Sequence, residues 1–472
     1  MEETGVTTNL KLPDPMDLAR PHLGDVVATL ESHSPFASVG LSSIHGLSIT
    51  VDHQEERIHE ETPSAGTVLR AFDGKTLRER SVGSFALSDI QAEARALAAG
   101  LPANGSSPLD LSGEASGRRD FALSMAVPPE NLSLSEKLDR CRALQSRLRN
   151  VDPRVQNARV TYLERIENSL VRNRQADMAQ AIHRLRLGIV VLVRDGEAVR
   201  YNWLTKSHTG GWEGLEFSDE EIGGVVEVAL RLLEAGRIDP GEYDVVTTPG
   251  VSGTICHESF GHGVETDMFV KERARAAYFI DETVASSIVD IFDDPTYPGA
   301  FGAYYFDDEG TLARPTKIVE AGVFRGGITD LGSATVLGIP RTANGRRQDY
   351  SRKAYARMSN TYFGPGSSGL DDLVGQAGDG IFLQKWSSGM EDPQGWGIQV
   401  TCHIAQEIRE GRLTGKYFTP VVISGYVPDV LRTVRGVGRE VAIEGGWCGK
   451  GHKEMVPVSS GGPHMLLRAH LG

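Results

Sequence analysis

The segment CHESFGHGVETD, residues 256–267, carries side chains suited to metal-assisted hydrolysis. His257 and His262 offer imidazole nitrogens, which zinc prefers, and Glu258 offers a carboxylate that can take a proton from water. The two histidines are five positions apart, whereas the HExxH pattern of zinc peptidases places them four apart. The segment therefore predicts a metal site only if the backbone compensates for the extra residue.

The angle between His257 and His262 around a helix decides whether both can reach one metal ion. On a regular α-helix, a spacing of four places two side chains about 40° apart, and a spacing of five places them about 140° apart. A π-bulge would insert one residue into a turn and restore a common face. Alternatively, the helix would end early, with Gly261 and Gly263 letting the backbone swing His262 inward. A regular helix through the segment would exclude the metal site.

A catalytic zinc ion needs three protein ligands and one open position, so a third ligand must come from elsewhere. The candidates are Cys256, Cys402, Cys448, His403, His452 and the acids of FDDEG (306–310). Cys256 adjoins His257 and would point about 100° away from it on a helix. Cys448 lies in GGWCGKGH, a glycine-rich loop after a predicted strand, where a thiolate can face a cleft.

Several other polar residues each allow two interpretations. His452 is either a fourth ligand or an exposed loop residue. The acids of FDDEG (306–310) either accept hydrogen bonds from ligand histidines or form a solvated turn. Arg346 and Arg347 either bind a substrate carboxylate or form ion pairs with acids of a neighbouring loop or subunit.

The elements that must position these residues divide the chain near residue 240. Helical spacing marks 87–101, and a capping box of Ser133 and Glu136 begins a helix over 133–150. An Asp195-Gly196 turn predicts a hairpin over 187–203. After residue 240, short strands alternate with glycine turns, as at Ala321-Gly322 and Glu410-Gly411, which indicates an antiparallel sheet or barrel.

We therefore predict an α+β protein, because 472 residues exceed one ordinary core. Its parts are a flexible N-terminal lead-in (1–20), an N-terminal α/β domain (21–240) and a C-terminal antiparallel β-rich domain (241–472) that carries the HExxxH helix.

Composition excludes several functional classes. The formal net charge is −14 and no basic block offsets it, so we expect no nucleic-acid partner. We expect no membrane association, because no apolar run is long enough to span a bilayer. The acidic, polar N-terminus differs from a secretory signal, which predicts a cytoplasmic protein. The four cysteines include no CxxC pair, which argues against a zinc ribbon or disulfide framework.

The motifs VSGTICHESFGHGVETD, FDDEG, ANGRRQDYSRKAYARMSNTYFGPG and WCGKG follow one another over residues 245–458. This order resembles the TldD/PmbA (TldD/TldE) family of metallopeptidases, with weaker similarity upstream. HExxxH with a distant CGK resembles its metal-bearing, TldD-like branch. The resemblance implies an N-terminal α/β domain, a C-terminal curved sheet or barrel, and a site that faces an enclosed cavity.

The resemblance also implies residue roles and partners. His257, His262 and Cys448 match the metal ligands, of zinc or of another divalent transition metal such as copper, and Glu258 matches the catalytic base. The implied activity is hydrolysis of amide bonds in unfolded or small peptides. The implied partner is a metal-free TldE/PmbA-like paralogue in a heterodimer, or a second copy in a homodimer.

Three stretches depart from the family pattern. Residues 387–408 lack the usual Val-Asp pair, 451–454 read GHKE, and 356–360 read ARMSN. We therefore keep as an alternative a dedicated hydrolase for a small amide or peptide-like intermediate in natural-product biosynthesis. A non-catalytic binding or modulator subunit is the third hypothesis.

Overall fold

The computed structural model describes residues 10–102, 115–451 and 453–472, and it is the mixed α+β fold that the sequence predicts. Its described α-helices are α1 (Asp14–Ala19), α2 (Leu23–Glu31), α3 (Leu87–Ala99), α4 (Leu134–Arg149), α5 (Asp219–Arg231), α6 (Pro249–Cys256), α7 (Thr266–Val270), α8 (Leu331–Leu337), α9 (Leu370–Ala377) and α10 (Val427–Arg432). Short 3₁₀ helices cover Arg20–His22, Pro129–Asn131, Trp212–Gly214, Leu232–Glu234, His262–Val264 and Arg275–Phe279.

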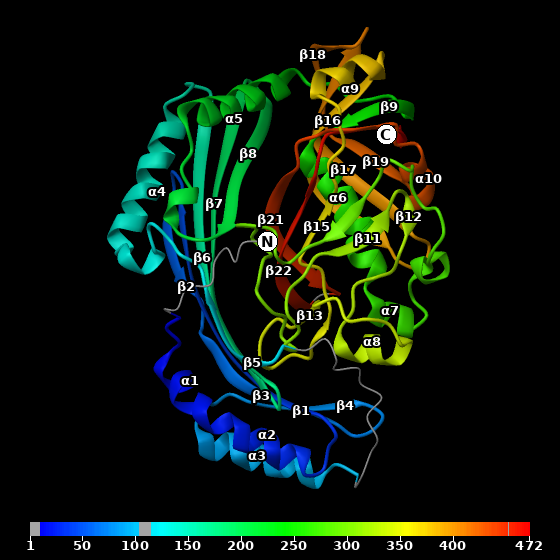
Figure 1. Cartoon of the computed structure of the whole chain (residues 1–472). Helices are drawn as coiled ribbons and strands as arrows, with labels where there is room; N and C mark the ends of the chain where they lie inside the picture. The colour runs from blue at the N-terminus through cyan, green and yellow to red at the C-terminus, as the bar shows by residue number, and fades with distance from the viewer. Residues whose placement is uncertain (1–9, 103–114, 452) are drawn as a thin grey trace.

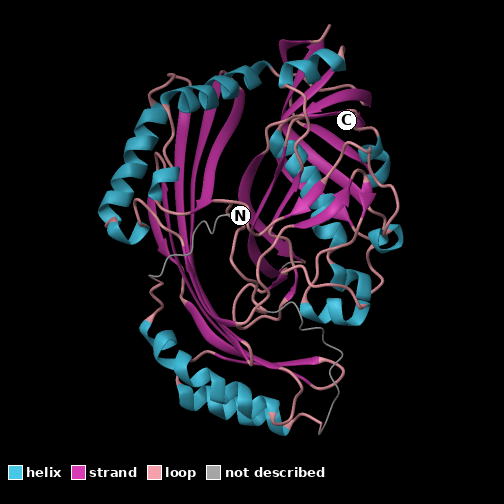
Figure 2. Ribbon diagram, in the orientation of Figure 1, coloured by secondary structure: helices cyan, strands magenta, loops and turns pink. Residues whose placement is uncertain are grey.

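The first half of the chain forms one long, curved sheet, which is mostly antiparallel (Figure 1). Its strands are β1 (Ala37–Val51), β2 (Glu56–Glu60), β3 (Ser64–Phe72), β4 (Leu77–Val82), β5 (Gly117–Ala122), β6 (Val155–Asn173), β7 (Ala176–Asp195) and β8 (Ala198–Thr209). They follow the order β4-β3-β1-β6-β7-β5, with β2 beside β1 and β8 beside β7. Helices α1 to α5 cover the outer face, and the other face turns toward the second half of the chain (Figure 2).

Local sequence signals explain several of these elements. Ser133 and Glu136 form the predicted capping box at the start of α4. Asp195 pairs with Ala198 across the predicted hairpin turn, where Gly196 has a φ of 56°. Residues 14–19 of the predicted lead-in differ from the flexible segment expected there, because α1 buries Met16 against the core under the sheet. The domain boundaries at 20 and 240 stay a prediction.

The second half of the chain is rich in strands, as predicted. A seven-stranded sheet contains β9 (Gly241–Thr247), β16 (Gly380–Asp392), β17 (Gly397–Arg409), β18 (Arg412–Phe418), β19 (Val421–Tyr426), β20 (Gly436–Val437) and β23 (Met465–Leu471). Five of them close a barrel in the order β16-β9-β23-β19-β17, because β17 pairs again with β16. The barrel thus places α6 and the site segment after it against a closed apolar core.

A second sheet, part of which lies between the barrel and the N-terminal sheet, carries Cys448. Its order is β12-β11-β10-β15-β22-β21, with a separate small ribbon of two strands nearby. The strands are β10 (Ile291–Asp293), β11 (Thr316–Glu320), β12 (Val323–Phe324), β15 (Asn360–Phe363), β21 (Ala442–Lys450) and β22 (Lys453–Gly462), and the ribbon is β13 (Gly345–Arg346) with β14 (Tyr355–Ala356).

Buried polar contacts join the two halves. Arg70 on β3 donates to the carboxylate of Glu309 at 2.8 Å, and both side chains are about 4% exposed or less. The same carboxylate accepts the backbone N–H of Leu331 at 2.6 Å. Gln180 on β7 donates to the carbonyl of Phe306 at 3.0 Å. The FDDEG acids therefore do not form a solvated turn, because Asp307 and Glu309 are buried, and Glu309 joins the two halves.

Replacing Arg70 by methionine would leave the Glu309 carboxylate buried without its ion-pair partner. We expect a loss of about 3–5 kcal/mol of unfolding free energy, measured by urea denaturation. Arg231→Met is the matched control, because its pair with Glu227 is exposed on both sides. The control should lose much less, because an ion pair exposed on both sides contributes little to stability. Equal losses in the two variants would contradict the role given to the buried pair.

Candidate metal centre

The segment with the two histidines leaves the regular helix where the metal hypothesis requires it. Helix α6 continues into a π-helical turn over His257–Gly261, followed by the 3₁₀ turn at 262–264. Of the two backbone routes considered from the sequence, the structure shows the π-helical one. The imidazole rings of His257 and His262 lie 5.1 Å apart between centroids and are nearly perpendicular, at 87°. The extra residue therefore does not separate the two side chains.

The π-helical turn is held by the packing around it. Trp396 donates its indole N–H to the carbonyl of Ser259 at 3.2 Å, which satisfies a backbone acceptor within the turn. Phe260 is fully buried and meets Trp396 at 5.6 Å between ring centroids. At Gly253 in α6, an added Cβ would lie 2.5 Å from the backbone nitrogen of Gly461, so only glycine allows this close contact with β22. The core therefore fixes the position of both histidines.

Cys448 reaches the histidines from β21. A register shift between Cys448 and Lys450 interrupts the pairing of β21 with β22, and such irregularities re-aim side chains near functional sites. The Sγ atom lies 2.8 Å from Nε2 of His262. The potential ligand atoms of His257, His262 and Cys448 all lie within 4.8 Å of one another. The structure thus brings together the three residues predicted to bind the metal.

The charges in this cluster favour a thiolate. Burial opposes ionisation, but His257 and His262 lower the pKa of Cys448 to about 5. Burial likewise opposes the protonated imidazole, yet Cys448 and Glu265 raise the pKa of His262 well above its ordinary value. A deprotonated sulfur is the form that binds metal ions. Cys448 is therefore in the ionised form that binds a cation.

A layer of charged residues behind the cluster orients His262. Its Nδ1 atom lies 3.7 Å from the carboxylate of Glu265, which is buried. Arg357 donates to Glu265 at 3.0 Å and to the carbonyl of Cys448 at 3.0 Å. Lys450 pairs with Glu265 at 3.0 Å and with Asp267 at 2.5 Å. The sequence motifs contained Glu265 and Arg357, but residue spacing alone did not reveal their contacts.

Glu258 lies beside the cluster and next to a second carboxylate, Glu391 on β16. Potential ligand atoms of Glu258, His262 and Glu391 also lie within 4.8 Å of one another. Burial raises the pKa of Glu258 to about 7; His257 opposes this change, and a hydrogen bond with Glu391 adds to it. At Gly389 on β16, an added Cβ would lie 2.4 Å from Glu258 Oε1. Only glycine at this position therefore lets the strand approach Glu258 so closely.

Other residues singled out in the sequence lie away from the cluster. Cys256 and Cys402 are buried in the core of the barrel half. His403 contacts the carbonyl of Tyr201 at 2.8 Å across the two halves. Arg346 donates to the carbonyl of Met358 at 2.6 Å, and Arg347 pairs with Glu79 at 3.2 Å, so both serve structural contacts. His452 lies outside the described residues.

One residue of the cluster, His257, borders a chamber of about 560 Å³ between the two halves. Its wall includes His257 and Glu258 together with residues of β7, β8, β16, β21 and β22. The lining residues are Arg186, Trp203, Leu204, Thr205, Ser207, Thr254, His257, Glu258, Lys385, Trp386, Ser387, Gly389, Glu444, Gly445, Gly446, Trp447, Val458 and Ser460. Part of the divergent stretch 387–408 thus lies in the wall of the candidate site.

The donor set fits a zinc ion. Donor atoms bound to one zinc ion are separated by roughly 3–4 Å, so three ligand atoms within 4.8 Å have the size of one coordination sphere. Nδ1 of His257 is buried without a hydrogen-bond partner among the described residues, as expected for a nitrogen that awaits a ligand. Two imidazoles and one thiolate are ligands that zinc accepts readily.

Comparison with known proteins agrees with this geometry. A family model described as the PmbA/TldA metallopeptidase C-terminal domain matches residues 240–470, and one described as the central domain matches residues 127–237. The chain belongs to the PmbA/TldD metallopeptidase family. Its assignment as a metal-dependent enzyme is thereby confirmed at the level of the family, and a metal cofactor follows from it.

Curated relatives support this membership. A metalloprotease from Methanothermobacter thermautotrophicus is 33% identical over 312 residues, which are 66% of this chain and 68% of that protein. A zinc metalloprotease TldD homologue from Saccharolobus solfataricus is 25% identical over 347 residues, which are 72% of this chain and 76% of that protein.

Solved structures show the same fold. A Thermotoga maritima protein, described as a proposed modulator of a DNA gyrase, superposes with a TM-score of 0.78 at 17% identity, over 97% of this chain and all of that one. TldE from Thermococcus kodakarensis superposes with a TM-score of 0.71 at 18% identity, over 95% of this chain and 99% of that one. No described helix is long and apolar enough to cross a membrane.

The metal-free protein should contain one thiolate at neutral pH. The absorbance at 240 nm of the chelated protein should rise through a single transition near pH 5, because the pKa of Cys448 is lowered to about 5. Burial raises the pKa values of Cys141 and Cys402 to about 12, so these two remain thiols. The transition should be absent in Cys448→Ala and present in Cys141→Ala; its persistence in Cys448→Ala would contradict the assignment.

Proposed function

We propose that this protein is a zinc-dependent hydrolase of amide bonds in unfolded or small peptides. His257, His262 and Cys448 hold the metal, and Glu258 is the general base. The observation that carries the proposal is the cluster of these three ligand residues within 4.8 Å, with the Glu258 carboxyl beside it in the wall of the same chamber. Family membership supports the reaction class.

The residues of the chain divide the work of hydrolysis. When bound, the metal supplies Lewis acidity, which makes water a better nucleophile and polarises the scissile carbonyl. Glu258 removes a proton from the attacking water and later donates it to the leaving amine. Glu391, hydrogen-bonded to Glu258, favours retention of that proton between the two steps. Glu265 and Arg357 keep His262 and the Cys448 backbone in place.

The partner and the substrate class are part of the proposal. The fold shared with TldE supports a complex with a metal-free TldE/PmbA-like paralogue, and a homodimer is the alternative. A dedicated hydrolase of a small amide in natural-product biosynthesis is the second candidate function. It is favoured by the chamber volume of about 560 Å³, within the range of small-molecule sites, and by the divergent stretch 387–408 in its wall.

Metal content tests the ligand assignment directly. Mass spectrometry of the purified protein should find about one zinc ion per chain, as a single three-ligand site requires. His262→Ala and Cys448→Ala should each lose that ion. Cys141→Ala is the matched control and should keep it, because Cys141 lies on the buried face of α4, away from the cluster. Retention of zinc in both ligand variants would show that the ion binds elsewhere.

Peptide hydrolysis tests the role of Glu258. Glu258→Gln preserves the size of the side chain but removes the base, so cleavage of an unfolded protein such as reduced casein should fall by about 10²–10⁴-fold. The zinc content should not change. The assay is run with the chain alone and again with its paralogue. Unchanged cleavage by Glu258→Gln, in a preparation that wild-type controls show to be active, would favour the binding-subunit hypothesis.

A further inference from the structure

The chamber beside His257 and Glu258 contains two cationic side chains to which the proposed hydrolysis assigns no role. Arg186 comes from β7 of the N-terminal sheet, and Lys385 comes from β16 of the barrel. Both line the same cavity as the candidate catalytic residues. Because they come from opposite halves of the chain, they face the chamber from two sides.

Arg186 has no ion-pair partner among the described residues. Its Nε atom is buried and has no hydrogen-bond partner. Burial lowers the pKa of Arg186, and Glu444 opposes this change only through its charge. A buried N–H donor without an acceptor costs free energy, so the retention of this half-buried arginine in a cavity wall indicates a ligand that supplies the acceptor.

Lys385 is half-buried, and its hydrogen-bond partners are neutral groups. Its ammonium donates to Oδ1 of Asn202 at 3.2 Å and to the carbonyl of Trp203, and it lies 4.9 Å from the centroid of the Trp203 ring. Burial lowers the pKa of Lys385 to about 8, so most of the population remains charged at pH 7. Register shifts on both sides of Lys385 interrupt the pairing of β16 with β17, and bulges of this kind re-aim side chains.

The nearby acid does not neutralise the two cations. Glu444 is exposed, and its carboxylate accepts a hydrogen bond from the Trp386 indole at 3.4 Å rather than forming an ion pair with either cation. One exposed acid thus faces two half-buried cations. Together with a metal ion at the cluster, this balance makes the chamber attractive to an anion.

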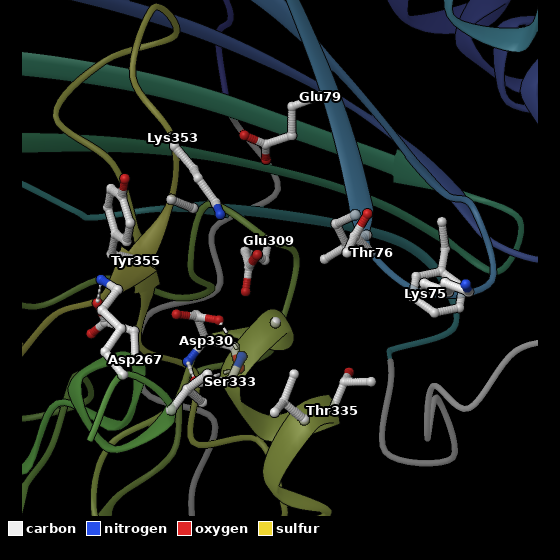
Figure 3. Close-up of a pocket in the computed structure, with 17 residues that line it drawn as sticks. Lys75, Thr76, Glu79, Asp267, Glu309, Asp330, Ser333, Thr335, Lys353 and Tyr355 are labelled. Carbon is white, nitrogen blue, oxygen red and sulfur yellow. Dashed lines mark hydrogen bonds and ion pairs between the residues drawn. The ribbon is translucent and has the colours of Figure 1, made fainter. Parts of the chain in front are cut away.

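A second cavity shows the opposite situation (Figure 3). It lies between the β3–β4 turn and helices α7 and α8, and its volume is about 240 Å³. Its buried acids already have partners: Glu309 pairs with Arg70, Asp267 pairs with Lys271 and Lys450, and Asp330 accepts the backbone N–H of Ser333 at 2.7 Å. No comparable unpartnered charge remains there among the described residues that line it.

We propose that Arg186 and Lys385 form a carboxylate-binding subsite that selects anionic substrates for cleavage beside Glu258. The proposal rests on the proposed function and specifies its substrate class. Guanidinium groups bind carboxylates in a planar, charge-assisted geometry, and an ammonium adds a point charge. The carboxylate is either the C-terminal α-carboxylate of a short peptide or the side chain of an acidic residue.

Three acetylated pentapeptides of alanine and glycine distinguish the sources: one with a free C-terminus, one amidated, and one amidated with a central glutamate. Zinc-loaded wild type should cleave at least one anionic peptide about tenfold faster, in kcat/KM, than the neutral peptide. Arg186→Gln and Lys385→Gln should each reduce that preference, and Arg186→Lys should retain part of it. Lys353→Gln is the matched control, because Lys353 is an exposed lysine of the second cavity.

Preference for the free terminus would identify the α-carboxylate, and preference for the glutamate peptide would identify the side chain. Equal cleavage of all three by wild type, or a preference that survives in the Arg186→Gln, Lys385→Gln double variant, would overturn the subsite.

If wild type cleaves none of the peptides, the proposed function fails for these substrates, and calorimetric binding decides the subsite separately. Zinc-loaded Glu258→Gln should then bind an anionic peptide about tenfold more tightly than the neutral one, and the added double substitution should abolish the difference. Absence of that difference would overturn the subsite.

Discussion

The candidate site depends on how the backbone accommodates one residue between His257 and His262. A π-helical turn is less regular than an α-helix and persists where its surroundings favour it. Here the surroundings are the barrel core, through Phe260, and the indole of Trp396, which satisfies the Ser259 carbonyl. The position of the metal ligands is therefore a property of the packed barrel rather than of the HESFGH segment alone.

The charges around the cluster alternate in sign from the centre outward. The Cys448 thiolate meets the imidazole of His262, which meets Glu265, and Glu265 meets Arg357 and Lys450. Each buried charge is therefore stabilised by a neighbour of opposite sign, which is the condition under which a protein interior tolerates ions. A bound metal ion would take the place of the proton on His262, because only a neutral imidazole nitrogen binds a metal, and the Cys448 thiolate would then face the ion.

The features that sequence reasoning predicted are those determined within a few residues. The capping box at Ser133, the turn at Asp195 and the π-bulge after Cys256 are local, and the family pattern placed Cys448 with the histidines. Glu391 was missed because its contact with Glu258 depends on the register of β16 and β17, which shifts at Lys385 and Trp386. In a strand, a slip of one residue turns a side chain to the opposite face, so such contacts emerge only from the folded sheet.

The chamber has walls from two layers of the fold. Hydrolytic groups come from α6, the turn after it and β21, whereas the N-terminal sheet contributes residues such as Arg186 and Trp203 from the opposite side. Substitutions in β7 and β8 can therefore alter which molecules are accepted without disturbing the bond-breaking machinery. This separation gives the scaffold a simple evolutionary route to new substrates, with reactivity inherited from one layer and selectivity acquired in the other.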